Sequence, residues 1–494
     1  MSVPELNGNQ PGGVKFLFRA LRHRNYRLFF LGQGVSVIGT WMQGTALGWL
    51  IIELANSSMQ AQFWSGLVPL GQLPTAILPL LTGALADRHS RQRILLITQV
   101  LSMLQAIALF FLVVTGRAEL WHLLLLSLVM GLINSFDVPA RQSFTVDMLE
   151  DRRDLGNAIA LNSSLVNGAR LIGPLIAGGI IAVLDTATCF LINALSYLAV
   201  IGALLAMRVP ASPIRRDGHV LEGIREGFKY AIAWPPIRTI LMLIAMASFI
   251  GVSYGVLVPV LAKYVLGGEA HVLGLLLGAS GAGALCGVLF LASRPSIHGI
   301  KTIIAASAGC FGIGLILLSF SHVLWLSMLT LLLTGFGMTL TMSASNTFLQ
   351  AVVDDDKRGR VMSLWTIAFM GMVPFGSLCT GSMSHYFSSI SANPNDGILL
   401  TLRAEGSIVL LCAALFATRL PMLRRLTHPI YIRKGLLPQV AMSAASMPSA
   451  MPEAPPAMAN PATGNPTNAR FSPDTAAPAG DVESRQPPTC QDMK

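Results

Sequence analysis

Long apolar stretches recur along the chain from about residue 28 to about residue 420. A bilayer core needs roughly 20 apolar residues per helix, and about twelve stretches reach that length. They are Leu28–Ile52, Phe63–Ala86, Ile94–Thr115, Leu120–Met148, Gly156–Leu184, Ala187–Met207, Thr239–Leu261, Val272–Ala292, Thr302–Phe320, Val323–Thr347, Val361–Met383 and Ile398–Leu420. Since they are continuously apolar rather than alternating, they are not porin-type strands. The pattern predicts an all-α membrane protein of about twelve transmembrane helices.

A polar segment in the middle of the chain divides these stretches into six and six. We expect an amino-terminal six-helix bundle at 28–207 and a carboxyl-terminal six-helix bundle at 239–420, after a cytoplasmic segment at 1–27. The linker, 208–238, has amphipathic spacing typical of a helix lying on the membrane surface. The cytoplasmic tail, 421–494, becomes rich in Pro, Ala and Ser, which predicts a mostly disordered region.

The two halves share a spaced pattern of acidic, glycine and leucine residues. At a constant offset, Asp151, Gly156, Gly168, Gly173 and Gly178 match Asp354, Gly359, Gly371, Gly376 and Gly381. The match aligns the acidic loop before the fifth helix with the acidic loop before the eleventh. This indicates a duplication of a six-helix unit.

Composition agrees with a lipid solvent, since 53% of residues are hydrophobic and 12% are charged. The net charge of +10 is concentrated in alternate loops, whereas the opposite loops carry only Arg117, Lys263 and Arg403. By the positive-inside rule this distribution predicts a multi-pass membrane protein with both termini cytoplasmic. We expect it in the bacterial inner (plasma) membrane. The charge therefore requires no nucleic acid as partner.

The sequence lacks the motifs of several classes of site, namely ATP-binding, metal-binding and catalytic sites. There is no G-x-x-x-x-G-K-[ST] loop, so we expect no ATP site. The six cysteines form no CxxC or Cys/His cluster, which argues against a metal or other cofactor. No catalytic constellation stands out, so we expect no enzyme.

The segment 83–93 has the spacing of a conformational latch. Gly83 permits close helix approach, Asp87 is placed to meet a facing helix N-terminus beside Arg88, and Arg91 can pair with Asp147 at the end of the fourth helix. A basic loop that only obeys the positive-inside rule would explain the arginines but not Gly83 and Asp87. The segment resembles the cytoplasmic loop signature of the major facilitator superfamily.

The fifth helix contains small residues and a proline at Gly168, Gly173, Pro174, Gly178 and Gly179. Small residues allow tight packing, and proline bends a helix and provides a place to flex. The alternative is a well-packed, kinked membrane helix without a special role. The pattern resembles the signature of the exporting antiporter branch of the same superfamily.

Ionisable residues at mid-depth in membrane helices are costly, so they are functional candidates by default. Asp137 and Arg141 lie one turn apart in the fourth helix, and Arg170 lies near the centre of the fifth. Asp137 is the candidate for proton coupling, and the arginines are candidates for binding an anionic substrate. Alternatively, Asp137 neutralises one of the arginines as a buried structural pair.

Polar and aromatic residues also punctuate the predicted helices. The substrate-binding candidates among them are Gln33, Trp41, Gln43, Tyr254, Asn346 and Trp365. A central cavity lined by such groups would suit a large, partly planar ligand. Interfacial belts and hydrogen bonds between helices explain these residues equally well.

Three further segments, Phe18–Arg27, Asp137–Ser143 and Asn157–Ser163, resemble the superfamily branch of the enterobactin exporter and macrolide efflux proteins. The resemblance covers about residues 15–420. It implies alternating access, and we expect a secondary active, proton-coupled exporter of a siderophore or related amphipathic metabolite or drug. Its partners would be that small molecule, protons and membrane lipid, and it would function as a monomer.

Other functions remain open at the level of sequence. A lysophospholipid transporter or an uptake symporter would have the same fold. A non-transporting membrane sensor or scaffold would belong to a different class. A scaffold has little reason to keep charges at mid-membrane, so the sequence favours transport.

Overall fold

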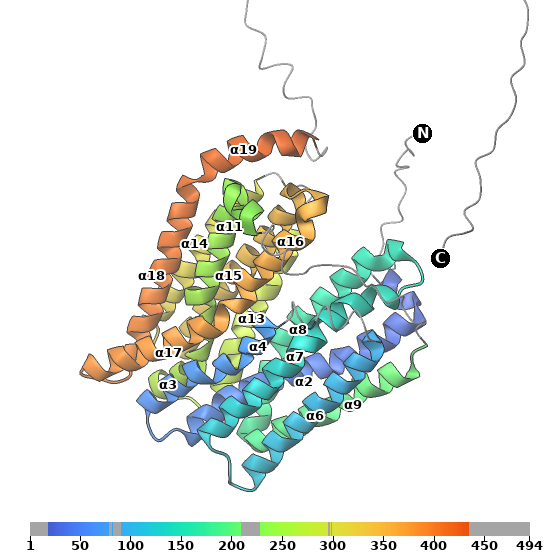
Figure 1. The fold of residues 1–494 in the computed structure, drawn as a ribbon. Helices are drawn as coiled ribbons and strands as arrows, with labels where there is room; N and C mark the ends of the chain where they lie inside the picture. The colour runs from blue at the N-terminus through green and yellow to red at the C-terminus, as the bar shows by residue number, and fades with distance from the viewer. Residues whose placement is uncertain are drawn as a thin grey trace, which may run out of the picture. The chain divides into compact units, whose positions relative to one another are not determined.

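The computed structural model describes residues 18–78, 82, 90–208, 228–294, 297 and 299–433, and all regular elements in these residues are helical. Figure 1 follows them through two groups of helices. The amino-terminal group comprises η1 (Arg19–Arg22), α2 (Arg24–Leu54), α3 (Ser58–Leu67), η2 (Val68–Gln72), α4 (Leu73–Ile77), α6 (Arg91–Val114), α7 (Leu120–Asp147), η3 (Arg152–Asp154), α8 (Leu155–Val183) and α9 (Thr186–Ala206). The carboxyl-terminal group comprises α11 (Pro235–Met246), η4 (Ala247–Gly251), η5 (Val252–Val256), α12 (Val258–Val260), η6 (Leu261–Val265), α13 (Ala270–Ala292), α14 (Ile300–Leu318), α15 (Leu324–Val352), α16 (Asp355–Thr366), η7 (Ile367–Gly371), α17 (Val373–Ile390), α18 (Asp396–Thr418) and α19 (Leu420–Arg433).

Eleven helices in the described part of the chain are long and apolar enough to cross a membrane, when the consecutive elements of Pro235–Val265 and those of Lys357–Ile390 are each counted as one helix. They coincide with eleven of the predicted stretches, which confirms the all-α membrane fold class. The other stretch, Phe63–Ala86, begins as the short consecutive elements α3, η2 and α4. Pro69 and Pro74 each lie in the first turn of a new element there, because proline lacks the N–H that a continuous helix would need.

The outer surface of the helices is apolar. Leu31, Ile97, Phe111, Leu195 and Leu411 are among many large hydrophobic side chains that protein does not cover. Water-soluble proteins avoid such wide apolar surface. These side chains therefore face lipid, as the composition predicts.

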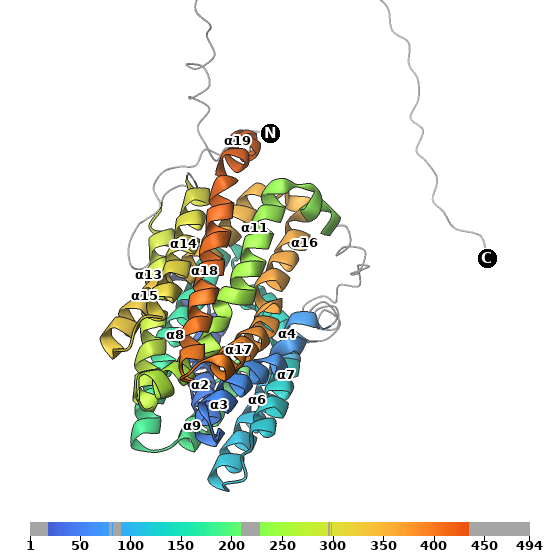
Figure 2. The same cartoon turned by 90° about the vertical axis from the view of Figure 1, so that its left-hand side faces the viewer.

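Each group is held together by pairs of long helices, and the two groups meet along two seams. Within the groups α2 packs on α8 and α9, α6 packs on α7 and α9, and α15 packs on α13 and α14. Between the groups α8 packs on α13 and α3 packs on α17 (Figures 1 and 2). The seams between the groups bring together segments far apart in the sequence.

Glycines set the close approach at both seams. A Cβ added to Gly178 would lie 2.9 Å from the Cα of Gly274, and one added to Gly66 would lie 2.7 Å from the Cα of Gly381. Among the glycines of the fifth-helix motif, Gly178 makes the backbone contact with α13. We call the end at which α2, α6 and α8 begin the basic end, and the opposite end the far end.

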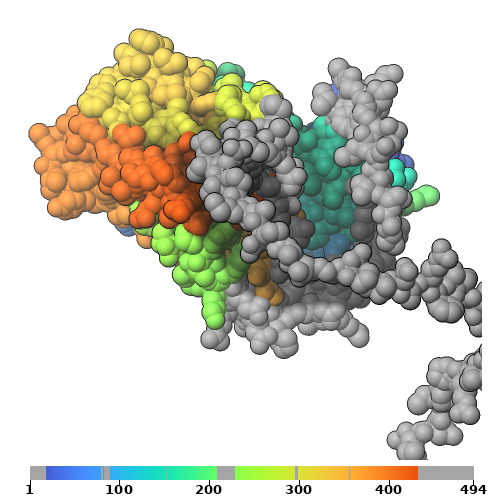
Figure 3. Space-filling view, turned by 90° about the horizontal axis from the view of Figure 1, so that it is seen from above, coloured from blue at the N-terminus to red at the C-terminus, as the bar shows by residue number. Residues whose placement is uncertain are grey.

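Helix α19 crosses the basic end of the carboxyl-terminal group at a steep angle to α18 (Figure 1). The space-filling view from this end shows orange-red residues of this region at the surface (Figure 3). Lys301 anchors α19, since its Nζ donates to Oγ1 of Thr427 at 2.5 Å and to the carbonyl of Leu423 at 3.4 Å. The first part of the predicted tail is therefore helical, and residues 434–494 lie outside the described residues, as does most of the linker.

Candidate functional site

A cavity of about 650 Å³ lies where the two groups of helices meet. Its volume is in the range of small-molecule sites in proteins. Its wall combines apolar surface with amides, hydroxyls and aromatic rings from both groups. The polar and aromatic residues in the wall are Thr40, Trp41, Gln43, Thr45, Ser65, Gln72, Gln105, Ser127, Asn134, Arg170, Tyr254 and Ser280.

Arg170 is the cationic residue of this wall. It projects from α8, one turn before Pro174, and its guanidinium carbon lies 5.7 Å from the ring centroid of Trp41. No carboxylate of the described residues forms an ion pair with it. In the part of the wall that comes from the carboxyl-terminal group, the hydroxyl of Tyr254 lies 3.0 Å from Oγ of Ser280. The cavity therefore presents a positive charge and aromatic surface with no counter-charge of its own.

A chain of amides fixes the polar wall beside Arg170. Asn193 donates to Oε1 of Gln43 at 2.6 Å, and Nε2 of Gln43 donates to Oε1 of Gln105 at 3.0 Å. Gln105 in turn donates to the carbonyl of Leu126 at 3.4 Å. Since each amide is held by its neighbours, the lining is pre-organised.

Toward the far end, side-chain hydrogen bonds join α3 to α17 across their seam. Oε1 of Gln62 accepts from the hydroxyls of Ser384 and Ser388, each at 2.8 Å. The contact between Gly66 and Gly381 lies one turn further along α3. The far-end halves of the two groups are thus joined by polar and backbone contacts.

The other seam changes character along its length. From Leu171 to Gly178, α8 is in backbone contact with α13, because Gly281 meets Leu171 and Gly274 meets Gly178. One turn nearer the basic end, a Cβ on Gly168 would meet nothing within 4 Å, and Ser164 is exposed. The two groups are therefore in contact at the far end and apart along α8 at the basic end.

Asp137 lies outside this cavity, in a buried position between α6 and α7. It forms an ion pair with Arg141 one turn along its own helix, with Nε of Arg141 at 2.9 Å. It also accepts hydrogen bonds from Thr98 and Gln99 of α6, each at 2.8 Å. Of the two sequence interpretations, the geometry favours the structural pair, formed within one helix; the proton-coupling role stays a prediction.

The predicted latch is described only in part. Nη1 of Arg91 lies 2.8 Å and 3.1 Å from the two carboxylate oxygens of Asp147, joining the start of α6 to the end of α7. Gly83, Asp87 and Arg88 lie outside the described residues. Because Arg91 and Asp147 belong to the same group of helices, their ion pair orients the loop, and its role as a latch stays a prediction.

The remaining candidates divide between the cavity and other places. Trp41, Gln43, Tyr254 and Arg170 lie in the cavity wall, together with Pro174 of the fifth-helix motif. The others lie elsewhere: Gln33 is buried in α2 with no hydrogen-bond partner on Oε1, Asn346 accepts from Gln350, Trp365 packs against Phe369, and Gly179 faces open space.

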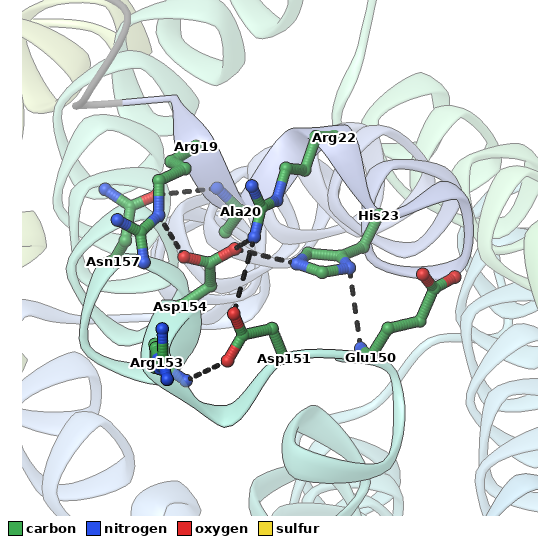
Figure 4. Close-up of polar contacts among 9 residues, drawn as sticks. All are labelled: Arg19, Ala20, Arg22, His23, Glu150, Asp151, Arg153, Asp154 and Asn157. Atoms are coloured by element: carbon green, nitrogen blue, oxygen red, sulfur yellow. Dashed lines mark hydrogen bonds and ion pairs between the residues drawn. The ribbon is translucent and has the colours of Figure 1, made fainter.

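A cluster of charges at the basic end was not predicted from the sequence (Figure 4). The carboxylate of Asp154 is buried and accepts from Nε2 of His23 at 2.8 Å and pairs with Arg19 and with Nη2 of Arg22, the latter at 2.8 Å. Nδ1 of His23 accepts from the backbone N–H of Glu150 at 3.4 Å, so His23 donates from Nε2. The cluster ties η1 to the loop between α7 and α8.

The pKa of Asp154 reflects a competition within this cluster. Burial by itself raises the pKa of the carboxyl, but hydrogen bonds from His23 and Arg19 and the charges of Arg19 and Arg22 lower it by more. The net pKa lies below its ordinary value. Asp154 is therefore a carboxylate at neutral pH.

A second acid missed by the sequence analysis is Glu405 of α18. It is 1% exposed, shares a hydrogen bond with Thr380 of α17, and its Oε2 has no partner. The signal was present, because Glu405 is the one acidic residue in the apolar stretch Ile398–Leu420. The rule that draws attention to Asp137 applies to it equally.

The sequence of the chain matches one family model and is similar to those of several known transporters. Residues 17–426 match the family model described as "Transmembrane secretion effector". The chain is 26% identical over 369 residues to the staphyloferrin A transporter of Staphylococcus aureus, covering 74% of this chain and 90% of the relative. It is 24% identical over 386 residues to the enterobactin exporter EntS of Escherichia coli, and the match covers 77% of this chain and 90% of the relative. It is also 24% identical over 366 residues to the multidrug efflux pump Tap of Mycolicibacterium fortuitum, covering 72% and 86%.

Solved structures share the fold. A bacterial homologue of the human lysosomal transporter Spinster, inward-facing and unoccupied, has a TM-score of 0.58 at 16% identity, covering 82% of this chain and 97% of that chain. A bacterial homologue of the iron transporter ferroportin in an inward-facing state has a TM-score of 0.57 at 18% identity, and the match covers 80% of this chain and 98% of that chain. At these identities the likeness concerns the fold alone.

Proposed function

The chain belongs to the major facilitator superfamily of membrane transporters, in its transmembrane secretion effector family, and from this premise we propose that it exports a small anionic molecule by alternating access. The substrate class is a siderophore or a related amphipathic metabolite or drug. The protein is not an enzyme, and the work of the cycle is binding and conformational change.

The observation that carries the proposal is the surroundings of Arg170. A guanidinium in a cavity without a carboxylate partner is completed by an anionic ligand, which it can bind through a planar fork of donors. Trp41 and Tyr254 add aromatic surface for a partly planar ligand. The names of two relatives, a staphyloferrin A transporter and an enterobactin exporter, support the siderophore class.

The contacts at the two ends support a state of the cycle that is open at the basic end. The basic end carries the loops rich in Lys and Arg, and the positive-inside rule supports a position for it on the cytoplasmic side of the bacterial inner membrane. Substrate would enter from there, and export would follow when the seams at the far end part and the basic end closes. In that second state the segment of Gly83, Asp87 and Arg88 would act as the latch.

We assign the driving force to the proton gradient. The sequence has no phosphate-binding loop for ATP, and buried carboxylates are available in both groups of helices. Both groups of helices of one chain contribute to the cavity wall. The protein is therefore expected to work as a monomer, with the substrate, protons and lipid as its partners.

Efflux from cells tests this function. Cells expressing the chain are loaded with staphyloferrin A, enterobactin or a macrolide, and efflux is measured with and without an uncoupler. We expect uncoupler-sensitive efflux of an anionic siderophore, lost in Arg170→Gln. The matched control is Arg403→Gln, because Arg403 lies over the ring of Phe320 at 4.2 Å and outside the cavity.

Other outcomes would replace the proposal. Transport of lysophospholipid across vesicles, or gradient-driven uptake instead of efflux, would identify one of the alternative transporters. Efflux by Arg170→Gln at the wild-type rate would remove the assignment of the anion site. A stable, inserted protein without transport of any compound would favour a sensor or scaffold.

A further inference from the structure

The carboxyl group of Glu405 is buried in the described core without a compensating cation. It is 1% exposed, and none of the ion pairs in the described residues includes it. Its hydrogen-bond partner is the hydroxyl of Thr380, and Oε2 has none. An ionised carboxylate without a cation is expensive to bury. Glu405 therefore holds a proton in this conformation.

The elements packed around Glu405 offer no replacement for a cation. On α14, Gly312 and Ile316 approach the neighbouring Gly406. On α17 the nearby titratable group is the thiol of Cys379, which cannot carry a positive charge. On α18 itself Arg403 is directed away, toward the ring of Phe320 and Oγ of Ser319.

Thr380 connects this carboxyl group to the seam between the two groups of helices. The next residue, Gly381, is in backbone contact with Gly66 of α3, and Ser384 one turn further donates to Gln62. Alternating access requires α3 and α17 to separate at the far end. That movement displaces the helix which carries the hydrogen-bond partner of Glu405.

Resting on the export function above, we propose that Glu405 carries the coupled proton. When the seam of α3 and α17 opens, water from the far side reaches the carboxylate, and an O–H bond of a hydronium ion breaks as the O–H bond of the carboxylic acid forms. When the seam closes, the protonated group is enclosed, as in the present conformation. The O–H bond breaks when the proton is released to water on the basic side in exchange for substrate, which restores the carboxylate for the next cycle.

Asp137 differs from Glu405 because its negative charge is compensated by neighbouring groups. Arg141, Thr98 and Gln99 compensate its charge, so it has no need of a proton when buried. All of these partners lie within the amino-terminal group and do not cross the seam. The two acids therefore make a matched pair for an experiment.

The test uses the full chain reconstituted into vesicles with labelled staphyloferrin A and, separately, labelled enterobactin as probes. Two rates are compared: exchange of label at equal concentrations without a gradient, and accumulation driven by a pH gradient. For Glu405→Gln, which mimics the protonated acid, we expect exchange to persist and gradient-driven accumulation to be lost. Asp137→Asn should keep the ratio of the two rates. Gradient-driven accumulation by Glu405→Gln at the wild-type ratio would overturn the proposal.

Infrared spectroscopy of the purified protein provides a readout that needs no substrate. We expect a protonated carboxylic acid band at neutral pH in wild type and in Asp137→Asn, and its loss in Glu405→Gln. Thr380→Val should shift the pH at which the band disappears, and Thr380→Ser should restore it. If the vesicles transport neither siderophore, the proposed substrate class fails while this titration still decides the proton site. A band unchanged in Glu405→Gln would refute the inference.

Discussion

At the scale of single residues, three charged groups at mid-depth have three different environments. Asp137 is compensated within its own helix and by α6, Arg170 faces a cavity without a counter-charge, and Glu405 is enclosed without a cation. By residue type alone, all three would be equally good candidates for a functional residue. Their partners are the basis for proposing a structural pair at Asp137, a ligand-binding group at Arg170 and a proton-binding group at Glu405.

If Asp137 is structural, removing it should destabilise the protein by leaving Arg141 without a partner. We expect Asp137→Asn to lower the free energy of unfolding by on the order of 3 kcal/mol, the scale for breaking a buried ion pair. The double variant Asp137→Asn with Arg141→Gln should recover part of the loss. Thermal melting of the purified protein in detergent measures both effects. A single variant that melts like wild type but has lost proton coupling would instead support the carrier role.

At the scale of elements, short segments at the ends of helices fix how the long helices connect. Element η1 is attached to the loop before α8 through Asp154 and through a hydrogen bond from the N–H of Ala20 to Oδ1 of Asn157 at 2.8 Å. Helix α19 is attached to α14 through Lys301. Both attachments lie at the basic end, where the groups of helices are apart along α8.

Attachment of η1 should depend on pH through Asp154. Because the pKa of this carboxyl is lowered on folding, its contribution is complete above the unfolded value of about 3.9 and is lost as pH falls through the folded value. We expect Asp154→Asn at neutral pH to raise the hydrogen-exchange rate of the Ala20 amide by about tenfold, or roughly 1.4 kcal/mol of local stability.

The pH dependence of hydrogen exchange and the amides of α6 provide controls for this prediction. In wild type the Ala20 amide should lose protection only in strong acid, while in Asp154→Asn its protection should vary less with pH. Amides in the centre of α6 should be unaffected by the substitution. Equal protection of Ala20 in both proteins would mean that the Asn157 contact suffices to hold η1.

At the scale of the whole molecule, glycines make the close contacts between the two groups of helices, and we propose that these contacts govern the conformational equilibrium. A side chain at Gly381 cannot be accommodated, because its Cβ would lie 2.7 Å from the Cα of Gly66 and 2.8 Å from the carbonyl of Gln62. Small residues at such contacts therefore permit the closed far end. The same contacts must be broken in the other state of the cycle.

Gly381→Ala should therefore shift the population toward the state that is open at the far end. We expect faster labelling of a cysteine at Ser65, in the cavity wall, by an impermeant maleimide added from the far side, in a background without other cysteines. The matched control is Gly179→Ala, since a Cβ at Gly179 meets nothing within 4 Å. Equal labelling in the two variants would show that the seam does not govern opening.

The sequence by itself determined the lipid solvent, the positions of the membrane helices and the family, because apolar length, charge placement and local motifs are properties of continuous segments. It also identified Trp41, Gln43, Arg170 and Tyr254, which the fold gathers around one cavity. Only the tertiary structure decided which charges are compensated, since the partners of Asp137, Asp154 and Glu405 come from other helices or from the next turn. A one-dimensional pattern records that a charge is buried, but the cost of burying it depends on distances to atoms that are remote in the chain.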